Sequence, residues 1–258
     1  MKTELFDYFL PPELIAQVPA DKRSESRLLV YERDKKKISH RQFSNIVDYF
    51  EPGDLLIVNS SKVIPARLYT KDKIEGSKEC EVFFIKLLQD GRFEAMVKPG
   101  KKFKVGRKHT LPGNNVIEVE EILDSGLRIM KTTDGKDPVE VFRKYGEMPL
   151  PPYITSRESE PERYQTVYSK LEGSVAAPTA GLHFDENVFK ALKDKGVKVA
   201  EVILHVGLGT FKPVEADDLD DHQMHEEVFF VPDETAKLFK ETKERNNKVW
   251  ACGTTSVR

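Results

Sequence analysis

Two stretches of the sequence alternate between a helical pattern and an apolar strand pattern, and this alternation constrains the fold more than any other feature. In the first stretch, Asp185 can cap a helix, Gly196 suits a left-handed helix end, and residues 197–206 form an almost continuous apolar run. In the second stretch, Asp233 begins a helical pattern that leads into an apolar run at residues 248–252. Such alternation implies parallel strands with helices on the faces of the sheet.

The same patterns predict how these elements are buried. In the second helix we expect Ala236, Leu238 and Phe239 to face the core, because apolar residues at helical spacing form one stripe. The run at residues 248–252 is expected to be a buried strand. Near the N-terminus, residues 54–58 predict a third strand of the same sheet.

Residues 62–145 have a different texture, with short strand patterns separated by turn signals such as Leu111-Pro112-Gly113-Asn114 and Asp124-Ser125-Gly126. Short strands at this spacing are typical of all-β modules, and we expect an inserted small β-barrel domain. The predicted fold class is therefore α/β, with a mixed sheet and flanking helices in a discontinuous domain (1–61 and 146–258), plus the inserted barrel (62–145).

Composition excludes several classes of protein. The 258 residues are 39% hydrophobic, which is enough for a proper core, and the net charge of -2 marks no general nucleic-acid or membrane partner. No apolar stretch approaches the roughly 20 residues of a bilayer crossing. The acidic residues and prolines near the start of the chain argue against a signal peptide. Cys80 and Cys252 lack metal-type spacing, so we expect a reducing, cytoplasmic location.

Loops rich in glycine and small polar residues follow the three predicted strands. They span residues 59–61, 207–210 and 253–256, and a fourth stretch, 173–184, leads into the Asp185 helix. Ligands of open α/β sheets bind beyond the carboxyl ends of the strands, where free backbone N–H groups are available. Each loop taken alone is equally compatible with a tight turn.

His183, His205 and His225 are the candidate proton carriers, because histidine titrates near neutral pH. Each is also compatible with a hydrogen-bonded structural role. His222 and His225 lie close to Glu226 in the sequence, but no metal-binding signature completes the group, and we expect no metal.

Basic residues gather in two places. Six of them between residues 98 and 108 have no intervening acid and would either follow a phosphate backbone or protect an edge strand. Arg163 and Tyr164, with Arg157 and Tyr168 nearby, pair guanidinium and aromatic groups as RNA-binding sites do, although such tyrosines also simply pack. These residues alone indicate an α/β enzyme with an inserted barrel that acts on a nucleotide-like ligand.

The longer motifs resemble those of one known family. They are KVIPARL at residues 62–68, RYQTVY at 163–168, GSVAAPTAGLHF at 173–184, LHVG at 204–207 and GTTSVR at 253–258. In this order they resemble the S-adenosylmethionine:tRNA ribosyltransferase-isomerase family of queuosine biosynthesis. Members of that family continue past the GTTSVR segment, so we expect further strands and site residues from such a stretch.

The resemblance implies transfer and rearrangement of the ribosyl part of S-adenosylmethionine onto the 7-aminomethyl-7-deazaguanine base at the tRNA wobble position, which gives epoxyqueuosine, adenine and methionine. S-adenosylmethionine is then a consumed substrate, and we expect no cofactor, a tRNA anticodon loop as partner and a monomeric protein. The sulfonium makes the ribose C5′ hydrogens acidic, so the site needs proton carriers.

The resemblance also implies roles for individual residues. His205, His225 and Glu226 are the expected proton carriers, with His183 next. The expected S-adenosylmethionine contacts are Pro178, Thr179, Gly181, Gly207, Gly209, Thr210, Phe211, Gly253, Thr254 and Thr255. The expected tRNA contacts are Arg67, Lys98, Lys101, Lys102, Arg163, Tyr164, Gln165 and Arg258.

Two other functions fit the sequence. A phosphosugar- or nucleotide-processing α/β enzyme would hold a phosphate in the loop at residues 253–256. A non-catalytic tRNA-binding protein would bind RNA and leave S-adenosylmethionine intact.

Overall fold

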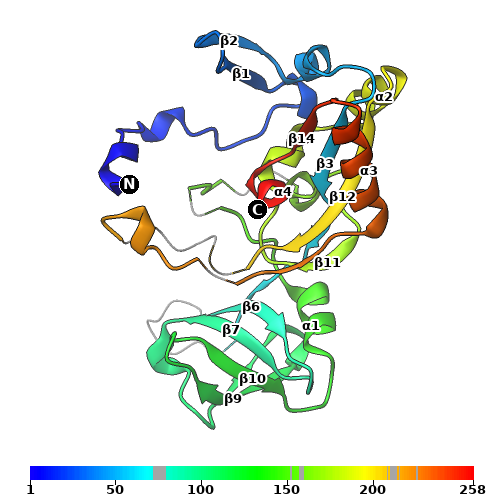
Figure 1. Cartoon of the computed structure of the whole chain (residues 1–258). Coiled ribbons are helices and arrows are strands. Elements are labelled where there is room, and N and C mark those ends of the chain that lie inside the picture. Colours follow the sequence, from blue (N-terminus) through cyan, green and yellow to red (C-terminus); the bar gives the residue numbers. More distant parts are fainter. Residues whose placement is uncertain are drawn as a thin grey trace. The chain divides into compact units, whose positions relative to one another are not determined.

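The computed structural model describes residues 1–71, 80–151, 153–156, 160–207, 209, 214, 216–224 and 226–258. The chain forms two compact units (Figure 1). Unit 1 comprises Met1–Lys62, Pro151–Glu172 and Ala177–Arg258, and unit 2 comprises Val63–Leu150 and Gly173–Ala176. Within the described ranges, none of the helices has the length and apolar character needed to span a membrane.

Unit 1 is built on a four-stranded sheet with the order β13-β12-β3-β14. Strands β3 (Leu55–Asn59), β12 (Lys198–His205) and β14 (Val249–Ala251) are parallel, and β13 (Val228–Phe230) pairs antiparallel with β12. Both Lys198 and Val249 lie opposite Leu55, so the three parallel strands end at the same edge of the sheet. The mixed α/β fold expected from the alternating pattern is confirmed.

Helices cover both faces of this sheet. Helix α2 (Glu186–Asp194) packs Val188 and Leu192 in one core cluster with Leu56 of β3. Helix α3 (Asp233–Glu244) contributes Leu238 to a second cluster that contains Leu55. Strand β3 is therefore buried from both sides, as its unbroken apolar sequence requires.

The predicted ends of the α2 helix are confirmed. The side-chain oxygen Oδ1 of Asp185 accepts a hydrogen bond from the backbone N–H of Val188 at 2.9 Å. Gly196 has φ +84°, a left-handed conformation that glycine adopts without steric cost.

The predicted inner face of α3 is wrong at two positions. Ala236 is exposed and Phe239 is 45% exposed, whereas Thr235, Leu238 and Thr242 face the sheet. The threonines can be buried because Thr235 Oγ1 donates to the carbonyl oxygen of Glu201 and Thr242 Oγ1 to that of Leu238, each at 2.7 Å. Apolar spacing alone therefore does not identify which residues of α3 face the sheet.

Strand β14 also differs from the prediction of a buried strand. It lies at the edge of the sheet, with Val249 and Trp250 half-buried and Ala251 exposed. One neighbouring strand and the short helix α4 (Thr254–Val257) leave this strand partly open.

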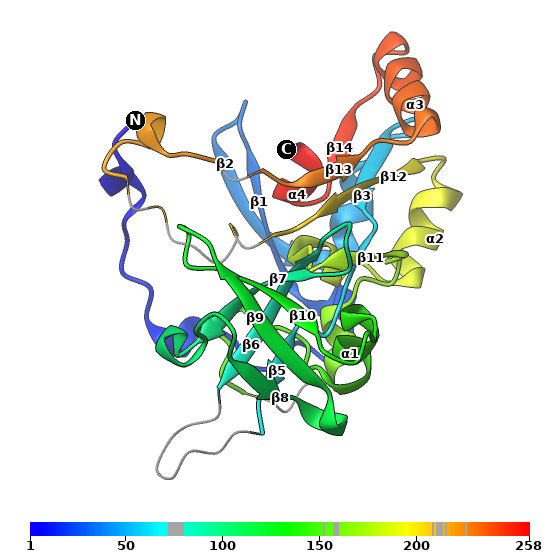
Figure 2. The ribbon, with the colours of Figure 1, turned by 90° about the horizontal axis from the view of Figure 1, so that it is seen from below.

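Unit 2 contains a six-stranded antiparallel sheet with the order β5-β6-β7-β10-β9-β8 (Figure 2). Its strands are β5 (Arg67–Tyr69), β6 (Glu81–Leu87), β7 (Phe93–Lys98), β8 (Lys108–Thr110), β9 (Val116–Ile122) and β10 (Arg128–Thr132). The backbone N–H of Lys71 donates to the carbonyl oxygen of Thr110 at 2.8 Å, which joins the ends of the two edge strands. Full closure into a barrel stays a prediction.

The core of unit 2 is aromatic. Helix α1 (Pro138–Tyr145) places Phe142 against Phe84 and Phe93, with ring centroids 5.3 and 5.8 Å away. The domain limits 62–145 stay predictions; the compact unit also includes residues up to Leu150, since Glu147 and Arg67 exchange two backbone hydrogen bonds.

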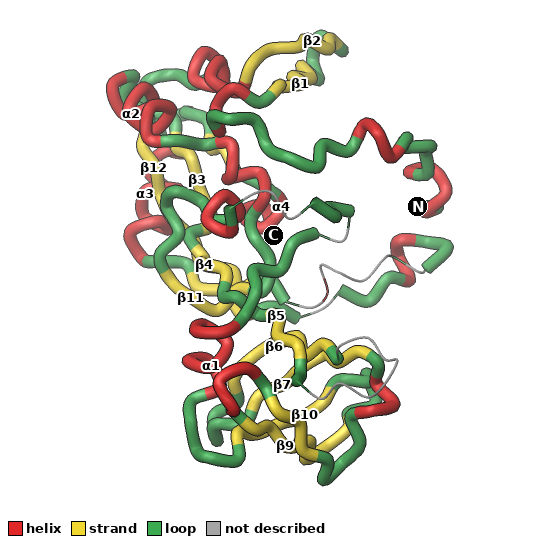
Figure 3. Tube along the Cα trace, turned by 180° about the vertical axis from the view of Figure 1, so that it is seen from behind, coloured by secondary structure: helices red, strands yellow, loops and turns green. Residues whose placement is uncertain are grey.

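The remaining elements are short. Strands β1 (Arg27–Glu32) and β2 (Lys37–Gln42) form a hairpin, and β4 (Ser61–Val63) pairs with β11 (Leu171–Ser174). Short 3-10 helices lie among the loops, and Figure 3 shows the helical segments in red. They are η1 (Thr3–Phe6), η2 (Pro12–Leu14), η3 (Arg23–Glu25), η4 (Phe43–Tyr49), η5 (Gly100–Lys102), η6 (Pro112–Asn114), η7 (Pro161–Tyr164), η8 (Thr179–His183) and η10 (Leu219–Asp221).

A buried carboxylate joins β3 to β14 at the amino end of the sheet. Asp54 is 1% exposed and accepts hydrogen bonds from the backbone N–H groups of Glu51 and Lys248 and from the indole Nε1–H of Trp250, at 3.0, 2.9 and 2.9 Å. Burial acts to raise the pKa of this carboxyl, but the hydrogen bonds outweigh it and hold the pKa below its ordinary value.

We predict that Asp54→Asn lowers the free energy of unfolding at pH 7 by about 2 kcal/mol, because a neutral amide is a weaker acceptor for these donors. A carboxyl whose pKa is lowered by folding stabilises the protein above the unfolded pKa of about 4, and this contribution is lost as the pH falls through the folded pKa. Urea unfolding at pH 7 and pH 3 should show a large difference between wild type and variant at pH 7 and a small one at pH 3. The exposed control Asp48→Asn should change the free energy of unfolding little at either pH. If Asp54→Asn lowers the free energy of unfolding by the same amount at pH 7 and pH 3, the prediction is contradicted.

Candidate functional site

The carboxyl edge of the unit 1 sheet is held together by the side chain of Asn59. This residue is fully buried at the end of β3, and its amide nitrogen donates to the carbonyl oxygen of Leu204 at 2.9 Å. Its amide oxygen accepts from the N–H groups of Leu204 and Ser61 at 3.0 and 3.1 Å. Asn59 thus fixes the ends of β3 and β12 relative to each other. The expected site residues did not include it, although a polar residue directly after a buried strand is a usable signal.

His205 is the last residue of β12 and lies one position beyond the Asn59 contact. Its side chain is half-buried, and its buried Nδ1 atom has no hydrogen-bond partner among the described residues. Burial lowers the pKa of its imidazole. Burial thereby favours the neutral imidazole, the form that can accept a proton.

Glu227 connects three segments of this edge. Its side chain is only 7% exposed; Oε1 accepts from the backbone N–H of Gly207 at 3.0 Å, and Oε2 pairs with the guanidinium of Arg258. Glu226, and not Glu227, is the proton carrier expected from the sequence. The acidic pair marks the place in the sequence, but only the tertiary contacts distinguish the two side chains.

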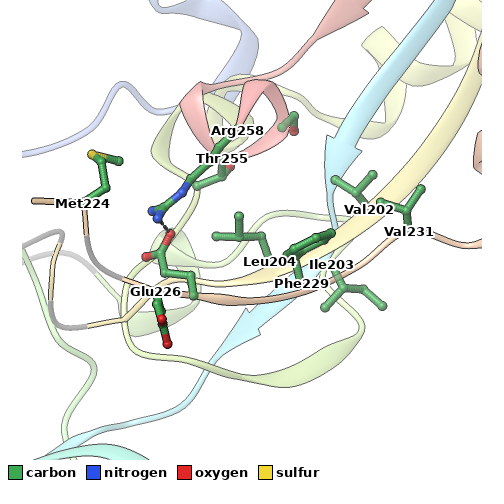
Figure 4. A pocket seen from close by; sticks show the side chains of 11 residues that line it. Val202, Ile203, Leu204, Met224, Glu226, Phe229, Val231, Thr255 and Arg258 are labelled. Atoms are coloured by element: carbon green, nitrogen blue, oxygen red, sulfur yellow. Dashed lines mark hydrogen bonds and ion pairs between the residues drawn. The ribbon is translucent and has the colours of Figure 1, made fainter.

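A cavity of about 580 Å³ is lined in part by Glu227 and Arg258 (Figure 4). One wall is apolar and is formed by Val202, Ile203, Leu204, Phe229 and Val231. The polar lining consists of Glu226, Glu227, Thr255, Ser256 and Arg258. The Oγ1 atom of Thr255 is buried without a hydrogen-bond partner among the described residues. We call this space the acidic cavity.

A second cavity of unit 1, of about 430 Å³, contains other predicted residues. Thr179, His183, Arg163 and Tyr164 all line it. His183 Nδ1 lies 3.0 Å from Ser26 Oγ, and burial lowers the pKa of its imidazole. The expected proton carriers are thus divided: Glu226 lines the acidic cavity, His205 follows its wall residue Leu204, and His183 lies in the second cavity.

Two of the expected glycines are explained by close packing. A Cβ atom on Gly181 would lie 1.9 Å from the hydroxyl oxygen of Tyr168, and one on Gly253 would lie 3.2 Å from the Cβ of Ala180. Gly253 also has φ +79°. Segment 178–183 and the turn before α4 therefore approach each other closely, whatever else these glycines contact.

The remaining expected residues lie elsewhere. Arg67, Lys98, Lys101 and Lys102 belong to unit 2, where Arg67 pairs with Glu81 at 3.0 Å. Gln165 and Gly209 are half-buried and Thr254 is exposed in unit 1, and Pro178 accepts the N–H of Gly181 at 2.8 Å. His225, Thr210, Phe211 and Arg157 lie outside the described residues. Within the described part of the chain, no group of three or more His, Cys, Asp or Glu is placed to hold a metal ion.

Comparison with known proteins gives consistent matches over the whole chain. A family model described as "Queuosine biosynthesis protein" matches residues 3–258. The S-adenosylmethionine:tRNA ribosyltransferase-isomerases of Thermotoga maritima and Thermosipho africanus are 49% and 48% identical over 258 residues, which is 100% of this chain and 76% of each relative. A crystal structure of S-adenosylmethionine tRNA ribosyltransferase from Thermotoga maritima has 36% identity and a TM-score of 0.45, over 98% of this chain and 70% of that one.

We predict that Gly181→Ala lowers the free energy of unfolding by about 1–3 kcal/mol, because the new methyl group overlaps the Tyr168 hydroxyl. Adding Tyr168→Phe removes the atom at 1.9 Å and should recover part of this loss. A double-mutant cycle by urea unfolding measures the coupling. Strict additivity of the two substitutions would show that the close approach is absent.

Proposed function

We propose where and how this chain carries out its reaction, on the premise that its family is known. The chain belongs to the queuosine biosynthesis protein family of S-adenosylmethionine:tRNA ribosyltransferase-isomerases. It transfers and isomerises the ribosyl moiety of S-adenosylmethionine onto the 7-aminomethyl-7-deazaguanine base at the wobble position of tRNA. The products are epoxyqueuosine-tRNA, adenine and methionine. The observation that supports a location for this chemistry is the acidic cavity at the carboxyl edge of the sheet.

The acidic cavity suits a sulfonium nucleoside. Glu226 and Glu227 place two carboxylates in its lining against the one guanidinium of Arg258, so the described lining carries an excess negative charge that attracts a cation. Phe229 adds an aromatic ring, whose face attracts a sulfonium by about 0.5–2 kcal/mol. The apolar wall can cover the adenine ring and exclude water.

Polar contacts to the substrate come from the loops around this cavity in the proposal. Thr255 offers its unpartnered hydroxyl, and Gly207, Gly209, Gly253 and Thr254 offer backbone groups. The other proposed contacts to S-adenosylmethionine are Pro178, Thr179, Gly181, Thr210 and Phe211.

His205 is the proposed proton acceptor. Deprotonation of the ribose C5′ carbon beside the sulfonium begins the reaction, and adenine then leaves as the ribose ring opens. A neutral imidazole is the form that accepts a proton, and the burial of His205 favours that form. Glu226, His225 and His183 are the further proposed proton carriers, and the attacking amine must also lose a proton because its ordinary pKa is near 10.

The proposed tRNA contacts lie in both units. Lys98 and Lys101 are exposed in unit 2, with Lys102 beside them in η5, and they would contact phosphates of the stem. Arg163, Tyr164, Gln165, Arg67 and Arg258 complete the proposed set. Cytoplasmic location and a monomeric state are also proposed.

Incubation with S-adenosylmethionine and tRNA that carries the 7-aminomethyl-7-deazaguanine base, followed by nucleoside mass spectrometry, tests the function. We expect epoxyqueuosine and one adenine for each modified tRNA. Glu226→Gln should raise KM for S-adenosylmethionine about tenfold and leave KM for tRNA unchanged, because it removes a charge near the sulfonium. The exposed control Glu234→Gln should change neither constant. Adenine release without modified tRNA would indicate a nucleotide-processing enzyme, and intact S-adenosylmethionine a non-catalytic RNA-binding protein.

The role of His205 predicts a distinct pH dependence. Because folding lowers its pKa, the neutral base is present at pH 7, and single-turnover rates should fall only as the pH drops below about 6.5. His205→Gln should slow the reaction about a hundredfold and remove this acidic limb. A variant with rates within a few-fold of wild type would exclude His205 as the proton acceptor.

A further inference from the structure

The second cavity of unit 1 is lined by three arginines, and its lining among the described residues contains no Asp or Glu. Arg23, Arg27 and Arg163 all contribute to it, together with Tyr164, His183 and the segment 16–20. The acidic cavity has the opposite character, since its lining contains two carboxylates. We call the second space the arginine cavity.

Arg23 and Arg163 hold each other's segments through backbone carbonyls. Arg23 donates to the carbonyl oxygens of Glu162, Arg163 and Leu182 at 3.1, 3.3 and 3.0 Å. Arg163 donates to those of Ala20 and Asp21 at 2.6 and 3.1 Å. These hydrogen bonds fix both guanidinium groups in place. They do not neutralise them, because a carbonyl oxygen carries no net charge.

The positive charges are close enough to act on each other. Burial lowers the pKa of Arg23, the charge of Arg163 lowers it further, and the carboxylate of Asp185 opposes both effects. Asp185 is already engaged as the cap of α2, where it accepts from Val188. Neither Arg23 nor Arg163 has a carboxylate within 4 Å among the described residues, so the cavity retains a strong attraction for an anion.

Arg27 gives the cavity a cation that is free to contact a ligand. It is exposed at the start of β1, and within the described residues its side chain forms no ion pair or hydrogen bond. Tyr164 adds a half-buried ring; His183 lies within hydrogen-bond distance of Ser26, and burial lowers the pKa of its imidazole. Guanidinium groups beside an aromatic ring are the combination that holds the phosphate and the base of an unpaired nucleotide.

We propose that the arginine cavity binds an unpaired nucleotide of the RNA substrate, with its phosphodiester at Arg27, Arg23 and Arg163 and its base against Tyr164. The proposal rests on the proposed function, in which tRNA is a substrate. It adds the part of unit 1 that holds the RNA loop.

Charge distinguishes this ligand from the other substrate. S-adenosylmethionine carries a sulfonium and an ammonium against one carboxylate, so it is a net cation that three arginines repel. Its methionine carboxylate alone would be attracted, but the two positive groups would accompany it into the cavity. A phosphodiester is an anion with no such penalty, and an anticodon loop offers nucleotides that need not be unpaired first.

Binding of an unmodified 17-nucleotide anticodon stem-loop RNA, measured over a series of KCl concentrations, tests this proposal. Arg27→Gln should weaken binding about fivefold and reduce the slope of log association constant against log salt by about 0.7, the value for one phosphate contact to a single strand. Arg33→Gln, an equal charge change on the same hairpin outside the cavity, is the control. Affinity for S-adenosylmethionine should be equal in wild type and both variants.

Tyr164 provides an independent arm. Tyr164→Leu should weaken binding of the same RNA about tenfold through loss of stacking, whereas Tyr164→Phe should bind nearly as wild type does. Thermal unfolding of each variant identifies any loss that comes from misfolding, and Arg27 supplies the decisive test if Tyr164→Leu unfolds.

Three outcomes would overturn the proposal. The first is an equal salt slope for Arg27→Gln and Arg33→Gln, and the second is equal RNA binding by Tyr164→Leu and Tyr164→Phe in folded protein. The third is a loss of S-adenosylmethionine affinity in Arg27→Gln without a loss of RNA affinity. The last result would assign the cavity to the methionine carboxylate. If wild-type protein binds the RNA as expected but forms no epoxyqueuosine on modified tRNA, the proposed function fails while RNA binding in this cavity stands.

Discussion

The buried amide of Asn59 is the interaction on which the arrangement of the acidic cavity depends. It satisfies both backbone groups of Leu204 and the N–H of Ser61, so it determines where β12 ends relative to β3. A buried amide without partners would cost about 1–3 kcal/mol, which makes any other register of these strand ends unfavourable. His205 ends β12, and Val206 and Gly207 follow it; Glu227 accepts a hydrogen bond from the backbone N–H of Gly207. One side chain in the core thus fixes the backbone from which the proposed proton acceptor and the glycine loop extend.

The two cavities of unit 1 divide the charge of the site. The net charge of the whole chain is only -2, and this balance conceals one cavity with an excess of carboxylates and another with three arginines. Such a division favours a reaction between a cationic nucleoside and a polyanionic RNA, because each cavity attracts the substrate of opposite charge. Gly253 lets the turn before α4 lie close to Ala180 of segment 178–183. That segment contributes Thr179 to the arginine cavity and α4 contributes Thr255 to the acidic cavity, so cavities of opposite character lie within one compact unit.

Local rules explain what could be predicted from the sequence. The cap at Asp185, the left-handed Gly196 and the parallel strands each depend on a few neighbouring residues, and the structure confirms them. The inner face of α3 expected from apolar spacing is correct at Leu238 and wrong at Ala236 and Phe239, because Thr235 and Thr242 have hydrogen-bonded hydroxyls and face the sheet instead. Asp54 and Glu227 act through partners far away in the sequence, so no local pattern distinguishes them, whereas Asn59 is marked only by its place directly after an apolar run. The sequence likewise does not show that His183 and Glu226 line different cavities, because that depends on how loops from different strands pack.

The alternative explanations for the basic residues at 98–108 can be separated by position. Lys108 lies in β8, an edge strand of the unit 2 sheet, where a lysine discourages pairing with another chain. Lys101 and Lys102 lie in η5, outside any strand, so edge protection does not account for them. Their backbone is fixed by Arg128, which is 8% exposed and donates to the carbonyl oxygens of Gly100, Phe103 and Gly126. A buried guanidinium that binds three carbonyls orders a turn whose own lysines remain without ion pairs among the described residues. Because the backbone that carries these lysines is already ordered, little backbone conformational entropy is lost when they bind a phosphate. This favours the nucleic-acid interpretation for the lysines of η5, whereas Lys108 in β8 fits edge protection.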